Sequence, residues 1–129
     1  MRRVVGHFDD LHFTESHFGP PSVEEGVLEI PVSGLLTLRG HPLCDGTLNP
    51  IRGYLVFNGV SKSVRKITEY IGDPRSPRGF KEEYLVEDIC TIGQEAGGTT
   101  YLFEGIMREP VAWVEWEVSA KNFELLVDL

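Results

Sequence analysis

The chain has 129 residues, of which 41% are hydrophobic and 25% charged, and its formal net charge is −8. These values are typical of a folded protein rather than a disordered segment, and the length suits one domain. The acidic balance argues against general binding to nucleic acids or anionic membranes, because both depend on cationic surface.

The N-terminus does not have the pattern of a targeting segment. Two arginines are followed by only two valines, Val4 and Val5, which are too few for the apolar region of a signal peptide. No stretch of the sequence approaches the length of a membrane-spanning helix. We therefore expect a cytoplasmic protein of bacterial type with no membrane association.

Short apolar runs separated by Gly, Pro, Asn and Asp recur along the whole chain. This pattern predicts a single all-β domain over residues 1–129, an antiparallel sandwich or flattened barrel of about eight or nine strands with at most one short helix. Residues 60–71 also fit a helical stripe, but their β-branched side chains favour a strand. The expected strands are residues 8–14, 26–32, 34–39, 51–57, 60–71, 83–91, 99–106, 111–119 and 123–129.

The N-terminal histidines do not have the spacing of a metal site. His7, His12 and His17 recur every five residues, which places neighbours on opposite faces of a strand and scatters them around a helix. We expect no metal and no cofactor. A metal site would require the segment to fold back on itself, with its ligand shell completed by Asp9, Asp10 or His41.

The chain carries no catalytic motif. It lacks the patterns of serine hydrolases, zinc proteases and nucleotide-binding loops. Cys44 beside Asp45, three residues after His41, is the nearest approach to a nucleophile with a base, and loops rich in Gly and Pro gather such residues by chance. Cys44 and Cys90 fit no metal-ligand pattern, so we expect buried free thiols rather than a disulfide. We expect no catalytic residues.

Asn58-Gly59 predicts a hairpin, because both residues tolerate the positive φ of a type I′ turn. The turn would pair residues 51–57 with residues 60–71 and would place Arg52 opposite Arg65. The first strand is apolar on both faces, which predicts a central position in the sheet. The second carries enough cations to serve as a guarded edge strand.

A second hairpin is predicted at the C-terminus from side-chain parity. Apolar residues occupy even positions up to Ala120 and odd positions from Phe123, and a two-residue turn at Lys121-Asn122 would produce that change. Trp116 shares the apolar face and is expected in the core. Trp113 shares the other face with glutamates, where it either lies under a loop or anchors a partner.

Cations are concentrated between residues 62 and 81, where six Lys and Arg residues stand against only two acidic residues. Residues 72–82 show no pattern of regular structure, and a long loop of this kind is often functional. Neighbouring glutamates could instead neutralise the cations. We expect a contact face for an anion or an acidic partner, formed by Arg52, Arg65, Lys66, Arg75, Arg78, Lys81 and Trp113.

These features predict a non-catalytic binding or protein-interaction module, with residues 52–81 as the contact face and an unidentified protein or anionic ligand as the partner. An immunity or antitoxin-like role fits the size and acidity of the chain. One alternative is a small enzyme whose pocket gathers residues scattered along the sequence. Another is a homodimer paired along strand edges. An enzyme would show convergent groups of displaced pKa in a deep pocket, and a binding module a shallow exposed face.

Overall fold

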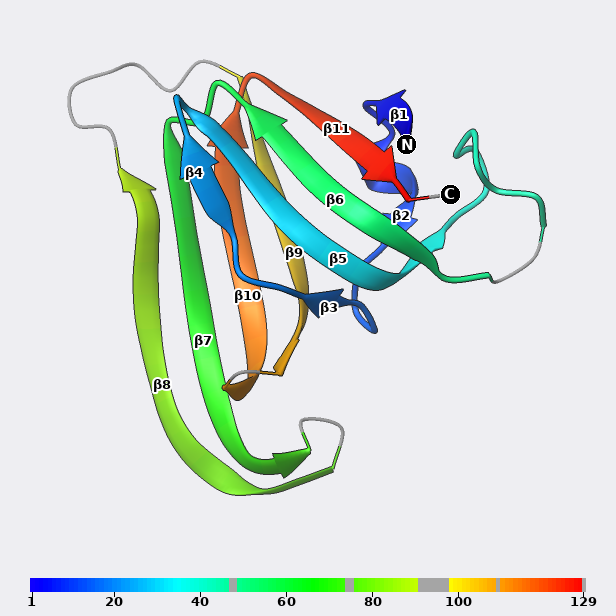
Figure 1. The fold of residues 1–129 in the computed structure, drawn as a ribbon. Helices are drawn as coiled ribbons and strands as arrows, with labels where there is room; N and C mark the ends of the chain where they lie inside the picture. The colour runs from blue at the N-terminus through cyan, green and yellow to red at the C-terminus, as the bar shows by residue number, and fades with distance from the viewer. Residues whose placement is uncertain (47–48, 74–75, 91–97, 109, 129) are drawn as a thin grey trace.

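The computed structural model describes residues 1–46, 49–73, 76–90, 98–108 and 110–128 and is nearly all strand (Figure 1). About 70% of the residues lie in strands and none of those that the structure describes lies in an α-helix, which confirms the all-β prediction. Among the described residues, no helix could span a bilayer. A single 3-10 turn, η1 (Phe8–Asp10), accompanies the strands β1 (Arg2–Val5), β2 (Leu11–His12), β3 (His17–Phe18), β4 (Ser22–Glu24), β5 (Val27–Thr37), β6 (Ile51–Asn58), β7 (Lys62–Asp73), β8 (Ser76–Cys90), β9 (Thr99–Arg108), β10 (Val111–Ala120) and β11 (Asn122–Val127).

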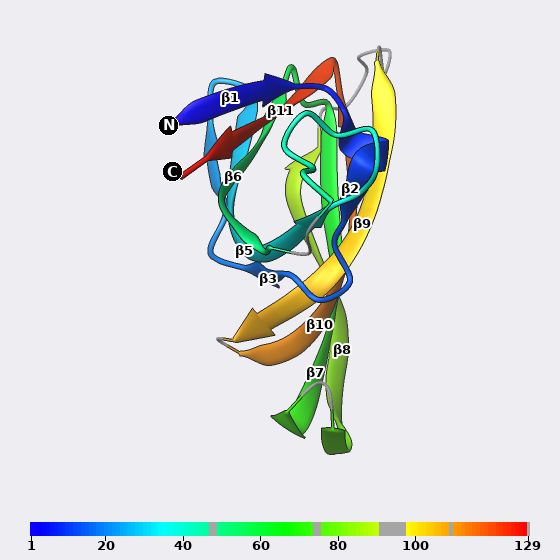
Figure 2. The same cartoon turned by 90° about the vertical axis from the view of Figure 1, so that its right-hand side faces the viewer.

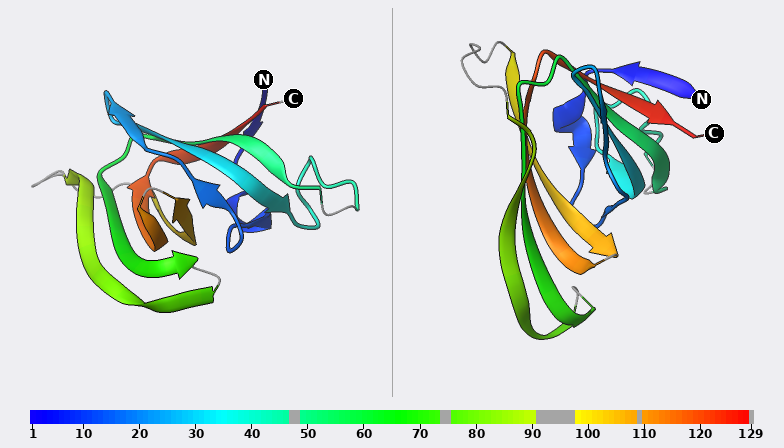
Figure 3. Two further views of the ribbon diagram at one scale, coloured as in Figure 1. Left: turned by 60° about the horizontal axis from the view of Figure 1, so that its bottom comes forward. Right: turned by 60° about the vertical axis from the view of Figure 1, so that its left-hand side comes forward.

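The strands form one open mixed sheet in the order β1-β11-β6-β5-β3-β9-β10-β7-β8, with β2 and β4 paired to β5 beside this path. The sheet curls over, so that a first layer of β1, β11, β6 and β5 faces a second layer of β9, β10, β7 and β8 (Figures 1 and 2). Short β3 joins the layers, pairing antiparallel with β5 and parallel with β9. The β7–β8 hairpin reaches beyond the first layer (Figure 3).

Aromatic rings from both layers fill the core between them. Phe57 of β6 stacks on Phe103 of β9 with ring centroids 5.6 Å apart, and Phe103 stacks in turn on Trp116 of β10 at 5.6 Å. Phe8 of η1 packs edge-on against both Phe57 and Phe123 of β11. Trp116 is almost fully buried, as its parity predicted.

The longer strands agree with the sequence patterns, and the differences lie at irregular positions. Residues 62–71 of the expected strand 60–71 are extended within β7, and β6 is central, lying between β5 and β11. Residues 8–14 are not one strand but η1 followed by β2. The two strands expected at 26–32 and 34–39 are one strand, β5, whose register shifts where Gly34 adopts a φ of 68°.

The hairpin predicted at Asn58-Gly59 is wrong. β6 pairs with β5 and β11, whereas β7 pairs with β10 and β8, so Arg52 does not face Arg65 and β7 is not an edge strand. Gly59 does adopt a positive φ of 64°, but the turn carries the chain from the first layer into the second. The Val60 amide donates to the carbonyl of Gly26 at 2.9 Å instead of closing a ladder with β6.

The C-terminal hairpin is also wrong, because β10 pairs with β9 and β7 while β11 pairs with β6 and β1. The chain crosses between layers at Lys121, whose amide donates to the carbonyl of Asn58 at 2.9 Å. Asn58 Nδ2 donates to Asn122 Oδ1 at 2.7 Å, so the two crossings lie side by side. Both layers bury their inner faces in one core. The change in parity between Ala120 and Phe123 therefore results from the crossing of the chain from one layer to the other.

The loop expected at residues 72–82 is mostly strand. β7 continues to Asp73 and β8 begins at Ser76, with these two residues paired in register. Pro77 pairs opposite Gly72 in β8, the last strand of the sheet order, and proline is tolerated in edge strands because its missing amide can face away from the ladder. Gly72 and Pro77 therefore belong to a long β-hairpin and not to an open loop.

Candidate functional site

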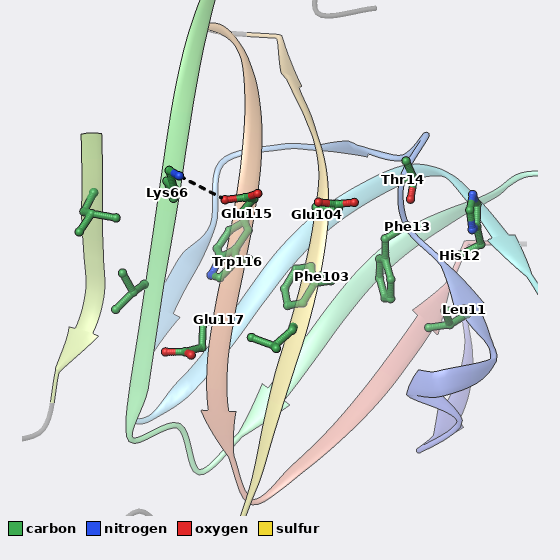
Figure 4. Close-up of a pocket in the computed structure, with 13 residues that line it drawn as sticks. Leu11, His12, Phe13, Thr14, Lys66, Phe103, Glu104, Glu115, Trp116 and Glu117 are labelled. Atoms are coloured by element: carbon green, nitrogen blue, oxygen red, sulfur yellow. Dashed lines mark ion pairs between the residues drawn. The ribbon is translucent and has the colours of Figure 1, made fainter. Parts of the chain in front are cut away.

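A groove of about 620 Å³ crosses the outer face of the second layer (Figure 4). Strands β9, β10, β7 and β8 form its base, and the segment Leu11–Thr14 forms one wall. Leu85 and Leu102 project into it and are 69% and 67% exposed. We call this surface the acidic groove; its other outward-facing residues are Val64, Lys66, Glu104, Glu115 and Glu117.

Strand register brings the charged residues of the acidic groove together. Leu102 pairs with Glu117 and Glu104 pairs with Glu115 across β9 and β10, and Glu115 also pairs with Lys66 of β7. Directly paired residues project from the same face of a sheet, so Glu104, Glu115 and Lys66 lie in one row across the outer face. Glu117 lies on the same face, opposite Leu102. Glu104 forms no ion pair with any residue that the structure describes.

The cations of β7 are paired with acidic residues on the neighbouring strands. Lys66 Nζ lies 3.4 Å from Glu83 Oε1 and 3.8 Å from Glu115 Oε2, and Lys62 Nζ lies 2.6 Å from Glu117 Oε2. These pairs are exposed and stabilise the fold only slightly. Their main effect is to neutralise the basic strand, so that the face as a whole is acidic.

Arg65 and Lys66 point to opposite faces of β7, so they do not form one contact surface. Arg65 turns inward, where its Nε and Nη2 donate to both oxygens of Asp88 at 3.0 and 2.8 Å. Ser63 Oγ donates to Asp88 at 3.2 Å and accepts from Trp116 Nε1 at 2.9 Å. The Arg65 guanidinium also lies over the Trp116 ring, 5.0 Å from its centroid. We call these four residues the Arg65–Asp88 network.

The other predicted contact residues are spread over the molecule. Arg52 lies exposed on β6 in the first layer, whereas Lys81 is exposed on β8 in the second. Trp113 is half-buried on the outer face of β10. Arg78 also lies in β8, and Arg75 falls outside the described residues. A basic contact face made from these residues stays a prediction.

A tyrosine and a glutamate pair on the inner face of the β7–β8 hairpin. Ile67 and Glu69 of β7 lie opposite Tyr84 and Glu82 of β8 in register. Burial raises the pKa of Tyr84 above its ordinary value of 10.0, and the Glu69 carboxylate, which accepts a hydrogen bond from it, raises the pKa further. This pair lies on the face opposite the acidic groove.

The N-terminal segment does fold back and brings three of the metal-site candidates together. His7 Nδ1 lies 3.2 Å from Asp10 Oδ2, and the His7 and His41 rings meet edge-on with centroids 5.7 Å apart. His41 is 3% exposed, and its Nδ1 accepts from the Leu43 amide at 3.1 Å. Across the described residues, no group of ligating side chains has the geometry to hold a metal ion.

His41 makes stability depend on pH in a definite direction. Burial lowers its pKa below 6.5, the nearby His7 and Arg2 lower it further, and Asp10 opposes them. The unfolded chain therefore binds this proton more readily, and acidification through pH 6.5 is expected to destabilise the fold. Urea unfolding at several pH values should show that the free energy of unfolding falls more steeply on acidification in the wild type than in His41→Gln. An equal dependence on pH in the two proteins would contradict this prediction.

The acidic groove was missed at the level of sequence because its residues come from separate strands. Glu115 and Glu117 were placed on the polar face of a hairpin, whereas Leu102 and Glu104 were not singled out. Alternation alone could have placed Leu102 and Glu104 on one face of β9. No protein-family model, curated protein or solved structure matches this chain, so the groove is interpreted from its own geometry.

Proposed function

We propose that this protein is a non-catalytic protein-binding module that receives a cationic segment of its partner in the acidic groove. The observation that carries the proposal is that Glu104, Glu115 and Glu117 line the same groove as two exposed leucines, Leu85 and Leu102. Large exposed apolar side chains together with one sign of charge are features of interaction surfaces. The charge of the groove favours a basic partner over the anionic ligand expected from residues 52–81.

Binding is favoured over catalysis by the positions of the groups with displaced pKa. Catalytic sites concentrate such groups in one pocket. His41 and Tyr84 are two such groups, and neither of them lines the acidic groove. A small enzyme would need a different centre from the surface proposed here.

The kind of partner and the oligomeric state are further parts of the proposal. An immunity or antitoxin-like role fits a groove that attracts a cationic protein. A homodimer through the β8 edge is less favourable, because its pairing with β7 has three register shifts and charged Lys81, Glu82 and Glu83 follow one another along it. Sedimentation at several concentrations would detect such a dimer.

Charge reversal in the groove tests the proposed function. The variant Glu104→Lys/Glu115→Lys should lose basic partner proteins that the immobilised wild type retains from host lysate, because the reversed groove repels them. The matched control is Glu24→Lys/Asp128→Lys, which makes the same change in net charge at exposed positions away from the groove, one in β4 and one directly after β11.

The two variants must differ for the proposal to hold. Proteins retained by the wild type and the control but lost by the groove variant would support it. If the groove variant retains the same proteins as the wild type, the acidic groove is not the contact surface. If both variants lose them equally, binding depends on total charge alone and the proposal is also wrong.

A further inference from the structure

Part of strand β9 has a neighbouring strand on one side only. β9 pairs with β10 along its whole length, but β3 pairs with it only at Ile106 and Met107. The segment before β3 turns away, because β2 pairs with β5. Within the described residues, the part of β9 that precedes Ile106 therefore has no strand on this side and forms an open edge within the sheet.

The backbone groups at this edge point away from β10. The Ile106 amide donates to the carbonyl of Ser16 at 2.9 Å on the β3 side. In an antiparallel pair, alternate residues direct both backbone groups to opposite sides, and the β9–β10 register has no shift. Leu102 and Glu104 therefore direct their amides and carbonyls outward, where the described residues provide no backbone partner.

The end of the acidic groove that is bounded by Leu11–Thr14 lies along this open edge. Leu102, Phe103 and Glu104 line one side of it and the segment Leu11–Thr14 lines the other (Figure 4). The rings of Phe13 and Phe103, both buried in the core, lie 5.3 Å apart and close the groove from below. The groove thus combines free backbone hydrogen-bonding groups, an aromatic floor and an acidic rim.

From these features, and on the basis of the proposed function, we infer that the partner segment binds as an additional β-strand along β9. Its backbone hydrogen-bonds to Leu102 and Glu104. Side chains alternate between the faces of a strand, so one set meets Glu104 on the outer face and the other lies over Phe13 and Phe103. The occupant is therefore an extended protein segment in which Lys or Arg alternates with apolar residues.

A synthetic peptide of alternating Lys and Val, about nine residues long, is a suitable probe because strands of this length are common in sheets. It should bind the wild-type protein at low ionic strength, where exposed charges are least screened. Hydrogen exchange at the Leu102 and Glu104 amides should slow when the peptide is added. Exchange at Phe103, whose amide faces β10, should change little.

Replacing Leu102 with proline removes one of the open-edge amides and leaves the ladder with β10 intact. The matched control is Leu102→Ala, which shortens the same side chain and keeps the amide. Peptide affinity should be roughly fivefold lower in Leu102→Pro than in Leu102→Ala, as expected for one hydrogen bond. If the proline variant does not fold, amide exchange in the wild type decides the question.

The outcomes separate this inference from the proposed function. Peptide binding that Glu104→Lys/Glu115→Lys abolishes, without slower exchange at Leu102 and Glu104, would overturn strand addition and leave the acidic groove as a contact surface. Failure of the peptide to bind would also overturn strand addition. The proposed function is decided separately, by capture of basic proteins with the groove variant and its control.

Discussion

Replacing Asp88 with alanine is expected to lower the free energy of unfolding by about 3–5 kcal/mol, because it leaves a buried cation without its counterion. The Arg65 and Asp88 side chains are only 12% and 7% exposed, and two hydrogen bonds join them. Ser63 also loses the oxygen to which its hydroxyl donates. Urea unfolding followed by tryptophan fluorescence would measure the loss.

Two controls identify the cause of that loss. Removing both charges in Arg65→Met/Asp88→Leu should recover most of the stability, because an apolar pair of similar volume avoids the desolvation of two ions. Glu117→Ala breaks an exposed ion pair and should change stability by less than about 1 kcal/mol. An effect of Asp88→Ala no larger than that of Glu117→Ala would show that the Arg65–Asp88 network does not stabilise the fold.

The face that each strand buries could be predicted from sequence because alternation is a local property. The parity of β10 placed Trp116 in the core, and the apolar character of β6 on both faces gave its central position. Strand partners are not local. A parity change such as that between Ala120 and Phe123 is produced by a hairpin and by a crossing between layers alike, and only the other strands decide between them.

The ion pairing of the β7 cations could not be predicted from sequence for the same reason. The sequence shows the cations of residues 62–81 together, but the groups that pair with them come from β8 and β10. Asp88 reaches Arg65 because the β7–β8 register shifts between Ser63 and Val64, and no local signal marks that shift. A cluster of cations in the sequence therefore does not show that Lys62, Arg65 and Lys66 are ion-paired in the fold.

The position of the acidic groove depends on the pairing of a very short strand, for which the sequence gives almost no pattern. It remains open beside β9 because the short strand β2 pairs with Thr37 and Leu36 of β5. A two-residue strand carries almost no periodicity, so sequence patterns do not reveal its partner. The outward positions of Leu102 and Glu104 follow from alternation, whereas the gap beside them follows only from the three-dimensional path of residues 11–14.

Truncating Phe57 to alanine is expected to lower the free energy of unfolding by about 3–5 kcal/mol, the range found for large buried aromatic side chains. Phe57 is fully buried, and its ring contacts Tyr101 at 5.3 Å, Phe103 at 5.6 Å and Phe123 at 5.1 Å between centroids. These rings come from both layers. Each neighbouring ring is held in place by its own strand, so the two layers cannot move together to fill the cavity that Phe57→Ala leaves.

A comparison with an exposed apolar residue shows whether the loss of stability depends on burial of the side chain. Leu85→Ala removes apolar atoms from a side chain that is 69% exposed, and it should change stability by no more than about 0.5 kcal/mol. Phe57→Leu fills part of the cavity, so its loss of unfolding free energy in chemical denaturation should lie between those of Phe57→Ala and Leu85→Ala. A similar small loss for Phe57→Ala and Leu85→Ala would show that this ring does not join the layers. The expected order instead follows from one core that is shared by both layers of the curled sheet.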